Sequence, residues 1–278
     1  MSVRKIKNLV FRLFCIASAA LGILILASIL HTLIIDGIKG INWAVFSELT
    51  PGPGSEGGLK NALIGSFMLT LVGILIAAPI GVLAGTWLAD KDESNKVAES
   101  IRFLNGMLMS APSVLVGLFV YAVIVVPTGG FSGWAGAVAL AILALPMIVT
   151  STEEMLRLVP PTLKEAGTGV GAPKWRVITQ LSYRAAAPGI ITAILLSVAR
   201  ISGETAPLLF TSLNSNFMTT DMSQPMANLP VTIYQFAMSP YSSWQQLAWA
   251  GALIVTTFIL IMNILATVLP KMMKARKA

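Results

Sequence analysis

The sequence has few of the residues on which most soluble enzymes and disulfide-bonded domains depend. It contains one cysteine, one histidine and only 11% charged residues in a chain of 278. Cys15 has no partner for an internal disulfide and lies in an apolar run, so we interpret it as a small core or lipid-facing residue. His31, near the end of the same run, is interpreted as an interfacial side chain. A soluble globular domain is excluded, because 55% of the chain is hydrophobic and the mean hydropathy is +0.80.

Motifs for enzymatic chemistry are missing as well. The sequence has no Gly-Lys-Ser/Thr phosphate loop, no His-Glu-x-x-His zinc motif and no Gly-x-Ser-x-Gly nucleophile motif. Gly52-x-Gly54-x-x-Gly57 matches a dinucleotide fingerprint, but it lies in a Gly/Pro-rich connection with no strand before it, so we interpret the match as chance. We therefore expect no catalytic residue, no metal site and no cofactor in this chain.

Long hydrophobic runs are abundant, and a helix needs about 20 apolar residues to cross roughly 30 Å of hydrocarbon. The sequence predicts six such spans, at about 13–35, 62–89, 101–126, 134–152, 185–212 and 244–269. The first span follows a basic N-terminus but is longer than the apolar part of a typical signal peptide, so we interpret it as a membrane helix. We expect an all-α polytopic membrane protein with Gly81-x-x-x-Gly85 packing closely against another helix and a short external helix over 230–237.

The basic residues predict how these spans are oriented. Sixteen of the 19 Lys and Arg residues lie in one alternating set of segments, Lys39 and Lys60 lie in the other, and Arg200 lies within a span. Because Lys and Arg accumulate in short cytoplasmic segments, both termini are expected in the cytoplasm. The net charge of +7 is spread along the membrane-flanking segments, which favours membrane lipid rather than nucleic acid as the partner.

The longest predicted cytoplasmic segment, about 153–184, has the pattern of two short helices joined by a turn. Thr162 and Glu165 form a capping-box pattern, Gly171 is suited to ending a helix, and Pro173 is suited to opening the next one. A helix cap at Glu165 and a helix stop at Gly171 are the purely structural alternative to a functional role.

The same segment resembles a known family. Glu165-Ala166-Gly167-x-x-x-Gly171 is similar to the Glu-Ala-Ala-x-x-x-Gly signature of binding-protein-dependent ABC transporter permeases, whose loop docks into the nucleotide-binding subunit. In combination, several motifs resemble more narrowly the PstA-type permeases of phosphate importers. These motifs lie at 57–65, 111–119, 152–160, 163–166, 171–175, 199–209, 229–234 and 248–250.

The resemblance implies a five-helix permease core plus an N-terminal helix, in the inner membrane of a bacterium. We expect residues 1–61 to form that helix and an external linker, 62–269 the permease domain, and 270–278 a basic tail. The implied partners are phosphate, a second permease subunit (PstC type), two ATP-binding subunits (PstB type) and an extracytoplasmic phosphate-binding protein (PstS type). ATP hydrolysis then belongs to the partners. The residues implied in ATPase coupling are Glu165, Ala166, Gly171, Lys174, Trp175 and Arg176.

Arg200 and Glu204 are the only charged residues well inside a predicted span. A charge at the bilayer centre costs roughly 2.5–3.5 kcal/mol, so such residues usually face a bundle interior or a water-filled cavity. About 15 residues, or roughly 22 Å of helix, separate Arg200 from the cytoplasmic start of its span. The i, i+4 spacing predicts that both side chains share one helix face. Gly203, which has no side chain, lets another group approach the backbone closely, and Pro207 has no N–H to bond to the Gly203 carbonyl.

We therefore predict a substrate pathway at Arg200, Gly203, Glu204 and Pro207, in which the arginine offers paired donors to a tetrahedral oxyanion. A mutually neutralising structural pair is the alternative. Two other functions stay open: a permease for sulfate or molybdate, and an ion-coupled secondary transporter. The second is disfavoured, because no convincing half-to-half repeat is found.

Two positions depart from the family pattern. Gly167 replaces the second alanine of the signature, which predicts a first short helix that is looser by about 1 kcal/mol. The residues at 182–184 stand where the family usually has a hydrophobic pair and proline, which predicts an altered entry into the fifth span.

Overall fold

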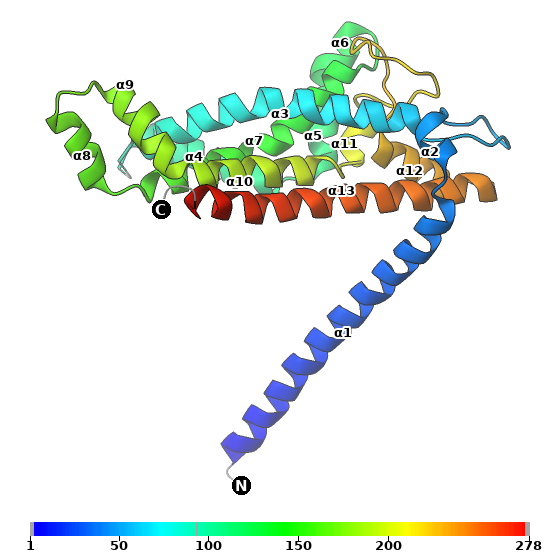
Figure 1. The fold of residues 1–278 in the computed structure, drawn as a ribbon, viewed down its shortest axis with the longest axis horizontal. Helices are drawn as coiled ribbons and strands as arrows, with labels where there is room; N and C mark the ends of the chain where they lie inside the picture. Colours follow the sequence, from blue (N-terminus) through cyan, green and yellow to red (C-terminus); the bar gives the residue numbers. More distant parts are fainter. Residues whose placement is uncertain (1–2, 93, 276–278) are drawn as a thin grey trace.

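A computed structural model describes residues 3–92 and 94–275, and within these ranges all regular structure is helical (Figure 1). The long helices are α1 (Val3–Gly40), α3 (Lys60–Ala89), α4 (Lys96–Ser110), α7 (Gly133–Arg157), α10 (Tyr183–Ile201) and α13 (Ser242–Ala275). The short segments are α2 (Trp43–Ser47), α5 (Ser113–Val120), the π-helical turn η1 (Tyr121–Val125), α6 (Val126–Thr128), α8 (Pro161–Gly169), α9 (Lys174–Arg176), the π-helical turn η2 (Val177–Ser182), α11 (Ala206–Leu209) and α12 (Leu229–Ala237).

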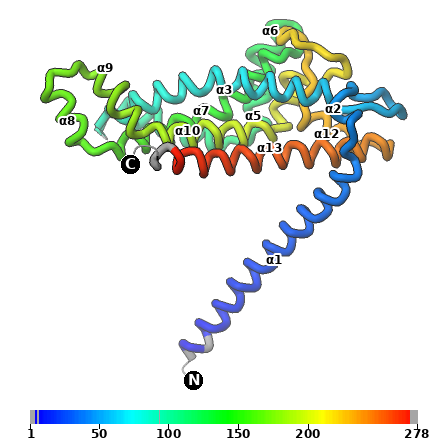
Figure 2. The backbone as a smooth tube through the Cα atoms, in the orientation of Figure 1, coloured from blue at the N-terminus to red at the C-terminus, as the bar shows by residue number. Residues whose placement is uncertain are grey.

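Helices α3, α7, α10 and α13 run along one another in an elongated bundle (Figures 1 and 2). The hairpin of α8 and α9 projects from one end of this bundle, which we call the hairpin end, and α2 and α12 lie at the opposite end. Helix α1 touches α13 only near its own C-terminus, where Gly37 faces Leu253, and then diverges from the bundle. Its most apolar stretch is fully exposed on this chain, as expected of a helix surrounded by lipid or by another subunit.

Five of the described helical stretches are long and apolar enough to cross a membrane, or six if α4 and the helix after it are counted as one bent span. The predicted all-α class with six spans is therefore confirmed, but two of the spans differ from the prediction. The third, at 101–126, is not a straight helix, because the chain bends by 104° between Lys96–Ser110 and Ser113–Thr128. Pro112 lies at the break and disfavours helical backbone at the residue before it.

The fifth span begins earlier and ends earlier than the predicted 185–212. It runs over Lys174–Ile201, and the chain then turns at 202–205 before the single turn of α11. Gly203 is a poor helix former, and Pro207 has no N–H to bond to the Gly203 carbonyl, so a helix is not favoured across this stretch.

Close packing of α3 on α7 forms the centre of the bundle. Every fourth residue of α3 is buried, and most of these residues are small; the set is Asn61, Gly65, Leu69, Gly73, Ala77, Gly81 and Gly85. A Cβ added at Gly81 would lie 2.8 Å from the Ile148 side chain, and one added at Gly85 would lie 2.6 Å from the Val149 carbonyl oxygen. The predicted packing role of Gly81 and Gly85 is confirmed, because only glycine admits α7 at this distance.

Buried asparagines organise the end opposite the hairpin. Asn61 accepts from the Thr50 N–H at 3.0 Å and donates to the Ser215 carbonyl at 2.8 Å, which ties the linker before α3 to the loop before α12. Asn228 caps α12 by accepting from the Val231 N–H at 3.0 Å. The short helix predicted at 230–237 is thus present as α12.

Candidate functional site

The hairpin between α7 and α10 is built around a glycine turn. Helix α8 ends in a Schellman motif, in which the Gly171 N–H donates to the Thr168 carbonyl at 2.9 Å and the Ala172 N–H donates to the Gly167 carbonyl at 3.2 Å. Gly171 has φ = 81°, a left-handed conformation that L side chains disfavour. The predicted pair of short helices joined by a turn at Gly171 is confirmed, and Pro173 precedes α9 as expected.

The hairpin presents apolar and basic side chains to its surroundings. Val170 is 86% exposed and Trp175 is 60% exposed, and Arg176 stacks over the Trp175 ring at 5.1 Å. Glu165 and Ala166 are also exposed, on α8. Lys174 points back towards the bundle, where its Nζ lies 2.7 Å from a carboxylate oxygen of Asp90 at the end of α3. The structure therefore brings the six predicted coupling residues onto one protruding element, with Lys174 anchoring it to α3.

One local expectation for this hairpin is wrong. The capping box does not form, because α8 begins two residues earlier than that pattern predicts, with Pro161 in its first turn and Pro160 at the cap position, and no side chain caps it. Proline is well suited to the first helical position, which outweighs the Thr162–Glu165 pattern. Gly167 is buried, and a Cβ added to it would lie 2.6 Å from Leu181 and 3.1 Å from Val177 of η2. The glycine thus lets α8 pack closely on η2, and the loosening of α8 by about 1 kcal/mol stays a prediction.

Arg200 lies at the far end of the helical stretch that begins at the hairpin. The next turn, at 202–205, is level with the middle of the longest helices, since Gly203 faces Ile259 of α13 and Ser202 shares a cavity of about 360 Å³ with Ile74 of α3. Arg200 is exposed on the surface of this chain, and among the described residues it has neither a hydrogen-bonding nor an ion-pairing side-chain partner. An arginine at this depth needs a polar partner, and the described part of this chain supplies none.

The geometry around Arg200 differs from the prediction in one respect. Glu204 does not share a helix face with Arg200, because α10 ends at Ile201 and the backbone at Gly203 and Glu204 follows tighter turns. Glu204 is half-buried and is not ion-paired with Arg200 in the described part of the chain. Pro207 is buried. A Cβ added to Gly117 of α5 would lie 2.6 Å from the Pro207 Cα. Arg200, Gly203 and Glu204 therefore surround a helix break, and Pro207 fastens the next turn to α5.

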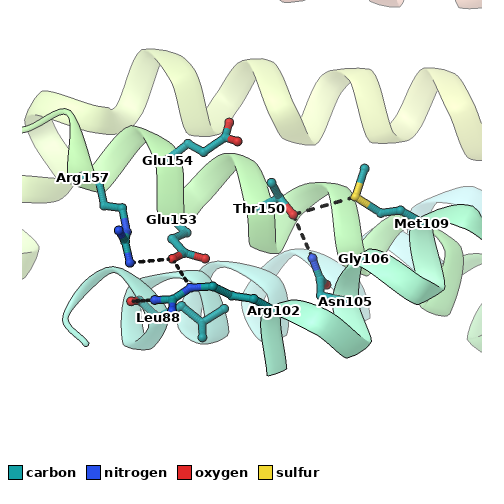
Figure 3. A pocket seen from close by; sticks show the side chains of 9 residues that line it. All are labelled: Leu88, Arg102, Asn105, Gly106, Met109, Thr150, Glu153, Glu154 and Arg157. Atoms are coloured by element: carbon teal, nitrogen blue, oxygen red, sulfur yellow. Dashed lines mark hydrogen bonds and ion pairs between the residues drawn. The ribbon is translucent and has the colours of Figure 1, made fainter. Parts of the chain in front are cut away.

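A second polar site lies between α4 and α7, close to the hairpin end (Figure 3). Here Glu153 Oε1 accepts a hydrogen bond from Arg102 Nε at 2.7 Å and forms an ion pair with Arg157 Nη2 at 3.1 Å, so one carboxylate oxygen holds two guanidinium groups. Asn105 donates to the Thr150 hydroxyl at 2.8 Å. These side chains line a cavity of about 590 Å³.

Sequence reasoning missed this second site. In the sequence, Arg102 and Arg157 belong only to the basic residues that orient the spans, and Glu153 lies only within the family motif at 152–160. One signal was available: Glu153 and Arg157 are spaced i, i+4 with the acid first, which is the favourable order for a helical ion pair. Nothing in the sequence places Arg102 beside them, because that contact joins residues 51 positions apart.

Comparison with known proteins gives the class of the molecule. Residues 77–275 match the family described as "Binding-protein-dependent transport system inner membrane component". The chain belongs to this family of transport permeases.

Individual relatives are more specific. The chain is 51% identical over 265 residues to the Phosphate transport system permease protein PstA of Pasteurella multocida (strain Pm70), with 95% of each chain covered. It is 48% identical over 267 residues to the protein of the same name in Yersinia pestis, covering 96% of this chain and 90% of that one. A solved structure of a bacterial alginate ABC transporter in complex with a periplasmic protein matches with a TM-score of 0.67 at 12% identity, over 95% of this chain and 96% of that one. This last likeness concerns the fold alone.

Proposed function

We propose that this chain is a permease subunit of an ATP-driven phosphate importer in the bacterial inner membrane. The proposal is supported by the relatives named PstA, which match nearly the whole chain at about half identity. In this role the chain forms half of the translocation pathway, together with a second permease of the PstC type. Two ATP-binding subunits of the PstB type supply ATP hydrolysis, and an extracytoplasmic binding protein of the PstS type delivers phosphate.

The α8–α9 hairpin is the proposed contact with the ATP-binding subunit. Val170 and Trp175 give it an exposed apolar surface, and Glu165 and Arg176 lie on the same projection. The hairpin end is then the cytoplasmic end, which agrees with the clustering of Lys and Arg in the segments there. Both termini are cytoplasmic in this arrangement. Residues 62–269 act as the permease domain, between the N-terminal helix with its linker (1–61) and a basic tail (270–278).

The observation that carries the proposed pathway is the exposed Arg200 at mid-bundle. A guanidinium without a partner among the described residues is available to a passing oxyanion, and its planar donors fit two oxygens of a tetrahedral phosphate. The break at Gly203 lets a ligand approach the backbone. Glu204 follows Arg200 by four residues, and its carboxylate can accept a hydrogen bond from the protonated oxygen of hydrogen phosphate, whereas fully ionised sulfate has no proton to donate.

Uptake by the assembled complex in proteoliposomes tests the function. Phosphate is expected to enter in an ATP-dependent manner, with excess sulfate or molybdate failing to compete; competition by either would assign the chain to another oxyanion. Arg200→Ala and Arg200→Lys should both lower phosphate uptake while the complex still assembles, because Lys lacks the planar fork. Glu204→Gln should lower uptake less than Glu204→Ala, since the amide carbonyl still accepts a hydrogen bond. Normal transport by Arg200→Ala in an assembled complex would remove Arg200 from the pathway.

A further inference from the structure

The Arg102–Glu153–Arg157 cluster connects α4 to α7 at the last turn of α7. Glu153 is 8% exposed, and its Oε1 atom accepts a hydrogen bond from Arg102 and forms an ion pair with Arg157. Arg102 also donates to the Leu88 carbonyl of α3 at 3.1 Å. A buried carboxylate held in this way is a fixed connection, because removing one partner leaves an uncompensated buried charge.

The rest of α4 is attached to the same helix. Asn105 Nδ2 donates to the Pro146 carbonyl at 3.2 Å as well as to Thr150, and Ala98 is buried in a cluster with Val149. Helix α7 is therefore the main packing partner of α4. Since only residues 158–160 separate α7 from α8, a displacement of the hairpin reaches Glu153 within two helical turns.

At its other end α4 leads towards the proposed pathway. The chain bends by 104° after Ser110 and enters α5, whose Gly117 packs directly on Pro207. Pro207 follows the Arg200–Glu204 break by three residues. The contacts thus form a continuous series from the hairpin through α7, Glu153, α4 and α5 to the far side of that break.

We propose that Glu153 is a positioning residue whose pairing with Arg102 and Arg157 makes α4 move with the coupling hairpin. ATP-driven movement of the hairpin then changes the position of Pro207 beside the proposed pathway. This proposal rests on the proposed function. It gives the cavity of Figure 3 a mechanical role, in which the arginines serve the carboxylate rather than a transported ion.

Two neighbouring carboxylates allow a matched test. Glu153→Gln removes the charge that holds both arginines, whereas Glu154→Gln changes an exposed side chain that points away from them (Figure 3). In reconstituted complexes the phosphate taken up per ATP hydrolysed should fall by about tenfold in Glu153→Gln, within the usual range of coupling energies, while basal ATPase activity and assembly persist. Glu154→Gln should keep the ratio of the parent complex. Equal ratios in the two variants would overturn the proposal.

Covalent rescue separates a positioning role from an ion-binding role. In a Cys15→Ala background, cysteines at Asn105 and Thr150, whose side chains are in contact, can be joined by a short bifunctional thiosulfonate reagent. Cross-linking should restore the uptake-to-ATP ratio of Glu153→Gln, and reduction should lower it again. If the cross-link stops transport in the parent that retains Glu153, α4 moves independently of α7. If the cross-link fails to restore the ratio in Glu153→Gln, Glu153 does more than join the two helices. Either result refutes the proposal. Failure of the proposed function is a different result, since the Cys15→Ala parent would then take up no phosphate.

Discussion

Substitution of Gly171 by valine tests whether the hairpin is the coupling element. Gly171 has φ = 81°, and in the described structure an added Cβ would meet no atom within 4 Å, so the only penalty is that of the backbone conformation. For an L residue the left-handed region costs roughly 1–2 kcal/mol, and β-branching makes it worse. A penalty of that size lowers the ratio of formed to unformed turn by about 5–30-fold. Gly171→Val should therefore insert normally and yet lose most substrate-stimulated ATP hydrolysis.

Gly169 provides a control two residues away. It is the last residue of α8, its φ is not positive, and an added Cβ there also lies in open space within the described chain. Gly169→Val introduces the same side chain on the same projection and is expected to help the helix by a few tenths of a kcal/mol. Gly171→Asn should be intermediate, because asparagine enters the left-handed region more readily than valine.

The assay compares these variants in the complete complex. Assembly is measured by co-purification of the ATP-binding subunits, and coupling by the increase in ATP hydrolysis when phosphate-loaded binding protein is added. The expected order of stimulation is Gly169→Val equal to the parent, then Gly171→Asn, then Gly171→Val. Full stimulation of an assembled Gly171→Val complex would refute the assignment of the hairpin as the coupling element.

Two further predictions concern topology and packing. Reporter fusions should give cytoplasmic signals at two sites and external signals at two others, and an external signal at the hairpin would contradict the orientation. The cytoplasmic fusions follow Asp92 and Lys174, and the external ones follow Pro53 and Asn216. Gly85→Leu should destabilise the α3–α7 contact by about 1–3 kcal/mol, seen as a lower thermal unfolding temperature in detergent. Gly106→Leu, on an open face of α4 with no atom of the described structure within 4 Å of an added Cβ, should not.

The features that sequence reasoning predicted correctly are those with a local cause. Hydropathy locates the spans because each one must be apolar over its own length. Gly171 is recognisable because a helix stop followed by Pro173 requires little beyond neighbouring residues. Gly81 and Gly85 reveal close packing because small residues one turn apart have few other uses in an apolar helix.

The errors arise where tertiary contacts or competing local signals decide. Hydropathy does not report direction, so an apolar stretch with a 104° bend at Pro112 has the same profile as a straight span. The predicted fifth span runs past Gly203 for the same reason, because the residues after the break are again apolar. At α8 two start signals compete within three residues, and Pro161 prevails over Thr162. Arg102 and Glu153 meet only because α4 folds back along α7, and no spacing rule covers such a contact.

Two connections lead from the hairpin to the Arg200 break, and they differ in kind. On one side the helical stretch Lys174–Ile201 runs without interruption for 28 residues, about 40 Å, from the turn at Gly171 to Arg200. On the other side α7, Glu153, α4 and α5 end on Pro207. The proposed pathway residues lie between these two ends, so a shift of the hairpin that reaches both ends changes their spacing, in addition to what the direct contacts of α7 with α10 and α11 transmit. Disrupting the turn at Gly171 affects the hairpin from which both connections start, whereas Glu153→Gln weakens only the connection through α4. Gly171→Val should therefore impair coupling more than Glu153→Gln, and the double variant should be no worse than Gly171→Val alone.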